Sequence, residues 1–266
     1  MKFMNSLGDK ARDTLLGSIA ALIEKDPKSN LPKIVKLSKL LASDKSSIEI
    51  INNFEDSYNH KKDFKFYVDD LIANTDHKIL KNFIVNILGN NLSSKDKKSK
   101  LYLKDHTQPR SLIINTKSKN IPGNILSYND LDKIIKESRK MGIFAFIFAG
   151  CEPFSLNYLY EIYEKYSDSL FIPVTEGTSL NENSCRKILK CANVIPLLSY
   201  NNTNIDILRK NGIPSFNIKY MQSLFKECNL NDNLSHLKTF SLDFTDSSQK
   251  KLITCSLTDL VNTDFI

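Results

Sequence analysis

Short apolar runs alternate with helix-like segments through the second half of this 266-residue chain, and this alternation constrains the fold most strongly. The runs are far shorter than a membrane span and are apolar throughout, as expected for strands that are covered on both faces. Strand, helix and strand in succession predict a parallel sheet flanked by helices. We therefore expect an α/β fold, a partial (β/α)6 TIM-like barrel, with strands at 111–115, 143–148, 170–174, 194–199, 213–218 and 237–244.

The first ninety residues have a different, helical pattern. Leu15, Ile19, Leu22 and Ile23 repeat at helical spacing, and later stretches at 30–41, 47–58, 64–74 and 77–88 also have helical character. The polar, charged segment that follows has no periodicity, which is typical of a linker. We expect a helical N-terminal domain at 1–94, a linker at 95–110, the partial barrel at 111–245 and a C-terminal tail at 246–266.

Charge and hydropathy limit the partners of the chain. The net charge is +7, and residues 1–110 hold 20 Lys and Arg against 14 Asp and Glu. The lysines either form a solvated surface or meet RNA, DNA or an acidic partner. We favour the solvated surface and do not expect nucleic acid as a partner. Since no apolar stretch approaches the roughly 20 residues of a membrane helix and the start lacks a signal-peptide core, we expect no membrane partner and a cytoplasmic location.

The cysteines and histidines show no metal-binding pattern. Five cysteines stand at 151, 185, 191, 228 and 255, and neither a disulfide framework nor a zinc ribbon has this spacing. The four histidines are scattered. We expect reduced thiols and no metal ligands.

Candidate site residues follow the expected strands. In parallel α/β folds, functional groups gather at the carboxyl ends of the strands. A Gly-Cys-Glu-Pro sequence follows the second strand, a Thr-Glu-Gly-Thr sequence follows the third, and a serine ends the fourth. An alternative is that 150–153 only forms a tight turn with Pro153 at the start of a helix. No catalytic residue is assigned, and the candidate site residues at these strand ends are Gly150, Cys151, Glu152, Pro153, Thr175, Gly177 and Ser199.

The order of these segments resembles the radical S-adenosylmethionine (SAM) superfamily over about residues 15–220. It is most similar to a bacterial branch with a helical N-terminal extension. That branch carries Gly-Gly-Glu-Pro after its second strand and Thr-Asn-Gly-Thr after its third. Gly150, Glu152 and Pro153 match the first motif, while Thr175 and Gly177-Thr178 match the second. The resemblance implies that the candidate site residues at the strand ends, with Cys151 and Ser199 among them, are cofactor-binding residues that contact SAM.

Two departures from the family pattern bear on the chemistry. Members of the superfamily bind a [4Fe–4S] cluster through a Cys-x3-Cys-x2-Cys sequence in the loop after the first strand. Here that loop reads "INTKSKNIPGNILSYND", without a cysteine, and such clusters require thiolate ligands. In addition, Cys151 adds a side chain where the family has glycine, and Glu176 adds a carboxylate where an Asn is common.

These departures lead to a functional hypothesis. We expect a degenerate, truncated radical-SAM-like protein that lacks the cluster cysteines and acts as a non-catalytic binding or regulatory pseudoenzyme. We expect no cofactor and no [4Fe–4S] cluster, while residual SAM binding stays open. A protein partner is expected, with a catalytic paralogue as the first guess. The alternatives are an enzyme that retains a SAM-binding site without the cluster, and a protein that binds nucleic acid through its basic N-terminal domain.

Overall fold

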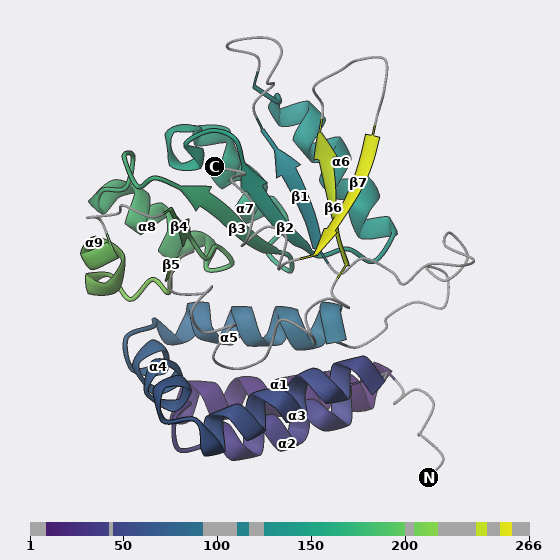
Figure 1. Ribbon diagram of the computed structural model, residues 1–266, viewed down its shortest axis with the longest axis vertical. Coiled ribbons are helices and arrows are strands. Elements are labelled where there is room, and N and C mark those ends of the chain that lie inside the picture. Colours follow the sequence, from purple (N-terminus) through teal and green to yellow (C-terminus); the bar gives the residue numbers. More distant parts are fainter. Residues whose placement is uncertain are drawn as a thin grey trace.

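The computed structural model describes residues 9–42, 45–92, 111–116, 125–199, 205–217, 238–243 and 251–256. Five α-helices and a turn of π-helix come first, and strands alternating with helices follow, as the sequence predicts (Figure 1). The expected linker at 95–110 lies outside the described residues. No helix within the described ranges combines the length and the apolar character needed to cross a membrane.

The N-terminal helices pack around a hydrophobic core of their own. Ile19, Ile23, Ile34 and Ile72 are among its buried members, and they include positions whose helical spacing predicted these helices. The elements are α1 (Asp9–Lys25), α2 (Leu31–Leu41), α3 (Lys45–His60), α4 (Lys62–Ala73), α5 (His77–Asn86) and the π-helix η1 (Ile87–Leu92).

The remaining helices and strands form one layered α/β unit. The first three strands are apolar along most of their length, and the helices between them carry apolar residues on one side. The elements are β1 (Ser111–Asn115), α6 (Tyr128–Lys140), β2 (Ala145–Ala149), the 3-10 helix η3 (Pro153–Ser155), α7 (Asn157–Lys165), β3 (Leu170–Thr175), α8 (Glu182–Cys191), β4 (Leu197–Leu198), α9 (Ile205–Lys210), β5 (Phe216–Asn217), β6 (Lys238–Asp243) and β7 (Lys251–Ser256).

The strands form one sheet with the order β5-β4-β3-β2-β1-β6-β7. Strands β1 to β5 are parallel and adjacent in chain order, which confirms the expected α/β class. The sixth strand pairs in parallel with β1, so it does not continue the series beyond β5. An antiparallel strand, β7, follows it within the segment expected to be a tail. The partial barrel is not confirmed by this arrangement.

The fourth expected strand, 194–199, is shorter than predicted. Only Leu197 and Leu198 form β4, while Val194 makes an isolated bridge to Phe171. Pro196 lies between them and has no N–H to donate, so the hydrogen-bonded ladder is interrupted there.

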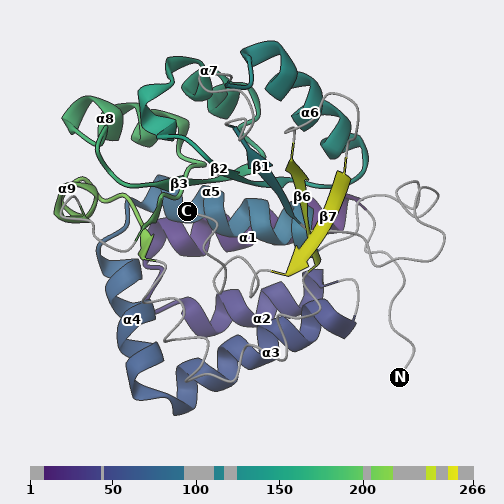
Figure 2. The same cartoon turned by 45° about the horizontal axis from the view of Figure 1, so that its top comes forward.

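Helices cover both faces of the sheet (Figure 2). On one face, α6, α7 and α8 bury Phe146 and Phe148 of β2. On the other face, Phe83 and Ile87 of the N-terminal helical segment pack against a cluster that includes Ala145. Because side chains alternate along a strand, β2 contributes Phe146 and Phe148 to the core layer on one face and Ala145 to the layer on the other.

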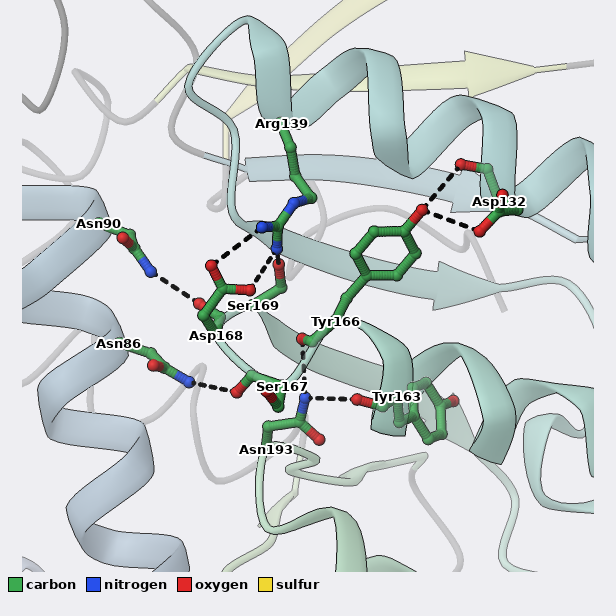
Figure 3. Close-up of polar contacts among 10 residues, drawn as sticks. All are labelled: Asn86, Asn90, Asp132, Arg139, Tyr163, Tyr166, Ser167, Asp168, Ser169 and Asn193. Atoms are coloured by element: carbon green, nitrogen blue, oxygen red, sulfur yellow. Dashed lines mark hydrogen bonds and ion pairs between the residues drawn. The ribbon is translucent and has the colours of Figure 1, made fainter.

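Polar contacts also join the helical bundle to the α/β unit (Figure 3). The Asn86 side chain donates to the Ser167 carbonyl (3.2 Å), and the Asn90 side chain donates to the Asp168 carbonyl (2.7 Å). Arg139 binds the Asp168 carboxylate from the opposite side. The turn between α7 and β3 is therefore held by residues from both parts of the chain.

A buried asparagine completes this turn. Asn193 is 1% exposed, and its amide nitrogen donates to the carbonyls of Tyr163 (2.9 Å) and Tyr166 (3.1 Å). These carbonyls lie at the end of α7, where the helix itself provides no donor. Figure 3 shows the Asn193 side chain pointing at this helix end. Asn193 thus links β3 and β4 to the helix that covers them.

Candidate functional site

The carboxyl ends of β1, β2 and β3 lie side by side, as the parallel pairing requires. Asn115 of β1 is opposite Ala149 of β2, and β2 is in turn paired with β3. Gly150 directly follows β2 with φ +96°, and Gly177 follows β3 with φ +78°. Residues with a Cβ rarely adopt such angles, so both glycines are required by the backbone itself. The backbone conformation of the two turns therefore explains why glycine is present at both positions.

Residues from two separate sequence motifs meet at this edge. The Thr175 hydroxyl donates to the Glu152 carboxylate, at 2.7 Å from Oε1 and 2.9 Å from Oε2, and the Glu176 N–H donates to Oε2 at 3.2 Å. Thr175 is 2% exposed, and its oxygen also accepts the Gly177 N–H at 2.8 Å. Glu152 is thus held by donors from the β3 end, with its charge at the carboxyl edge of the sheet.

Ser199 lies at the next strand end. Its backbone N–H donates to the Thr175 carbonyl at 3.0 Å. Pro153 begins the 3-10 helix η3, and the Ser155 hydroxyl donates to the Glu152 carbonyl at 2.7 Å. The segment 150–153 therefore forms a tight turn that leads into a helix, and the same turn places Glu152 against Thr175. The motif can therefore be both a tight turn and part of a candidate binding site.

Thr116 is a site residue that the sequence pattern did not single out. It follows β1 and is 2% exposed. Its Oγ1 donates to the Ala149 carbonyl at 2.8 Å and lies 2.8 Å from Cys151 Sγ. The available signal was its position immediately after the expected strand 111–115. A single threonine there is too common to mark a site.

The described cysteines lie in different surroundings. Burial raises the pKa of the Cys185 thiol to about 11 and that of Cys191 to about 12. Both thiols face the hydrophobic core between α8 and its neighbours. Cys151 is half-buried at the strand ends, Cys228 lies outside the described residues, and the side chain of Cys255 is not described. In the described ranges, no group of three or more His, Cys, Asp or Glu side chains could hold a metal ion.

The tyrosines of α7 pack inside the protein. Tyr163 is fully buried, and its ring lies 4.8 Å from the Phe171 ring and 6.1 Å from the Phe148 ring. Tyr158 is nearer the surface and donates its hydroxyl proton to the Leu126 carbonyl at 2.7 Å. Burial, with a smaller contribution from the nearby Cys151 thiol, raises the pKa of Tyr158 to about 12. The rings of these tyrosines therefore lie in the hydrophobic core or against it.

Comparisons with known proteins give only distant similarities. No family model and no curated protein matches the chain. The chain is similar to crystal structures of Streptococcus suis SuiB. The form bound to S-adenosylmethionine has 13% identity and a TM-score of 0.36, with 75% of this chain and 54% of that chain covered. The form bound to the precursor peptide SuiA has 14% identity and a TM-score of 0.32, with 74% and 47% covered.

The chain spans about half the length of these SuiB chains. Similarity at this level does not establish a shared family or activity. The functional interpretation therefore depends on the residues of this chain.

Proposed function

We propose that this chain is a radical-SAM-like protein that acts by binding or regulating another molecule and does not use a [4Fe–4S] cluster. The observation that carries the proposal is the composition of the β1 end. Thr116 follows the strand, and the segment from there to Asp130 contains no cysteine. The residues present do not fit a cluster, which needs three thiolates in this segment.

The other described thiols support the same proposal. Cys185 and Cys191 are buried within the α/β core, and their raised pKa values favour the neutral thiol over the thiolate that binds iron. Cys151 is at the correct edge of the sheet, but one thiolate is too few. We propose a protein as the partner; a catalytic paralogue is the first candidate to test. Cytoplasmic location and bacterial origin stay predictions from the sequence.

Anaerobic reconstitution with iron and sulfide tests this proposal. We expect no stoichiometric cluster by visible absorbance, by iron and sulfide content or by electron paramagnetic resonance. Weak iron binding at surface groups should be identical in the parent protein and in Cys151→Ser. One [4Fe–4S] cluster per chain, lost in Cys151→Ser, would overturn the proposal.

The second candidate is an enzyme that retains SAM binding without the cluster. The observation in its favour is the Glu152 carboxylate, which Thr175 and the Glu176 N–H hold in a fixed position. A fixed carboxylate suits the ammonium group of an aminoacyl ligand. Against it, Cys151 occupies the place of a glycine, and Glu176 adds a second negative charge that would repel the ligand's carboxylate.

Calorimetry with SAM, on the parent protein and on Cys151→Gly, separates these possibilities. We expect no heat of binding from either protein at millimolar SAM. The change Cys151→Gly should alter the free energy of unfolding by about 1 kcal/mol, because it adds chain entropy to the unfolded state and removes packing contacts. If Cys151→Gly binds SAM, and the further change Glu152→Gln abolishes that binding, the strand ends form a SAM-binding site that Cys151 obstructs.

Part of the positive charge of the N-terminal domain is paired with carboxylates, which does not favour a nucleic-acid function. Lys28, Lys39 and Lys81 form ion pairs with Asp69, Glu55 and Glu24. These carboxylates offset positive charge that would otherwise be available to phosphates. The solvated-surface interpretation remains our preference.

A further inference from the structure

The residue after β1 is bonded to the end of β2 through both its backbone and its side chain. The N–H and the hydroxyl of Thr116 each donate to the Ala149 carbonyl at 2.8 Å. Because that hydroxyl has a single proton, the Cys151 thiol donates to Thr116 Oγ1 across their 2.8 Å contact. The ends of the two strands are thus joined through three contacts at one buried threonine.

Two further hydrogen bonds extend this connection to α7. The Leu126 N–H donates to the Thr116 carbonyl at 3.0 Å, and the Leu126 carbonyl accepts the Tyr158 hydroxyl proton at 2.7 Å. A series of hydrogen bonds therefore connects four residues, from the end of β2, across the end of β1, to the first turn of α7. We call this set the clasp: Thr116, Leu126, Cys151 and Tyr158.

We infer that the clasp is a conformational device that limits access to the half-buried Cys151 thiol at the strand-end site. This inference rests on the proposed function only in taking the strand-end site as the binding site. The Cys151 thiol is hydrogen-bonded to Thr116 at the β1 end, and Cys151 directly follows Gly150 at the carboxyl end of β2. A ligand at the carboxyl ends of β1 and β2 would therefore lie near this thiol. Full exposure of the thiol therefore requires local breakage of the clasp, without unfolding of the core.

The rate of alkylation of Cys151 by iodoacetamide measures this opening, and peptide mass spectrometry resolves each cysteine. Thr116→Val removes the hydroxyl and keeps the side-chain shape, while Tyr158→Phe cuts the link to Leu126. We expect each change to raise the Cys151 rate about threefold to tenfold, the factor that corresponds to the net contribution of one hydrogen bond. A pH series separates access from ionisation, because the thiolate is the reactive form.

Matched variants and an internal reporter make the test specific. Thr116→Ser keeps the hydroxyl, and Tyr166→Phe removes a tyrosine hydroxyl that bonds to Asp132 outside the clasp, so both should retain the parent rate. Cys185 is fully buried and reports global unfolding. The inference fails if Thr116→Val and Tyr158→Phe leave the Cys151 rate unchanged, or if Cys185 accelerates in parallel. Neither result depends on the outcome of cluster reconstitution.

Discussion

Asn193→Ala is expected to lower the free energy of unfolding by about 1–3 kcal/mol, since the Tyr163 carbonyl is left unsatisfied while the Tyr166 carbonyl keeps the Ser169 N–H as its donor at 2.9 Å. The Asn193 amide bonds to the carbonyls of Tyr163 and Tyr166 at the end of α7. Its side chain is buried, so water cannot replace it without a rearrangement of the helix end. Urea denaturation followed by circular dichroism gives the change.

Two control variants identify the cause of this loss. Asn183→Ala, at an exposed position in α8, should change stability by no more than about 0.5 kcal/mol. Asn193→Asp keeps the shape but replaces the donor with an acceptor at neutral pH, so it should lose at least as much as Asn193→Ala. A stable Asn193→Asp protein would show that the side chain acts by filling space and not by capping α7.

The sequence predicted the parts of this fold that follow from local periodicity. The helical spacing of Ile19 and Ile23 and the apolar run through Phe146 and Phe148 gave the correct elements, because burial of a face imposes a period on the sequence. The meeting of Glu152 and Thr175 was also foreseeable, since the ends of adjacent parallel strands share one edge of the sheet.

The features that the sequence did not predict depend on distant partners. The strand β6 could in principle pair with β1 or with β5, at the two edges of the parallel strands. It pairs with β1, and no local pattern around 238–243 predicts this. Asn193 lies in a segment that reads as an ordinary loop, and only the position of the α7 end gives it a role. Thr116 becomes notable only once Cys151 lies beside it. In each case the missing information was a contact between residues far apart in the chain.

Gly212 joins the α/β unit to the helical bundle, and substitution there should affect both parts. It follows α9 with φ +69°, and its carbonyl accepts the Asp76 N–H at 2.7 Å. Asp76 in turn caps α5 by accepting the N–H groups of Lys78 and Ile79. A Cβ on Gly212 would lie 3.1 Å from the Asp76 nitrogen, which is backbone and cannot rotate away. The substitution therefore strains both the turn and the start of α5.

Gly212→Ala is thus expected to cost at least about 1–2 kcal/mol, the penalty for a side chain in the left-handed region. Gly17→Ala provides the matched control, because Gly17 is inside α1 and a Cβ added there would meet nothing within 4 Å. Alanine restricts the unfolded chain and favours the helix, so that change should raise stability by roughly 0.5–1 kcal/mol. Urea denaturation of the two variants should therefore give shifts of opposite sign. A loss in both would mean that α1 does not tolerate a methyl group at Gly17, while a gain in both would mean that the contact between Gly212 and Asp76 does not hold α5 in place.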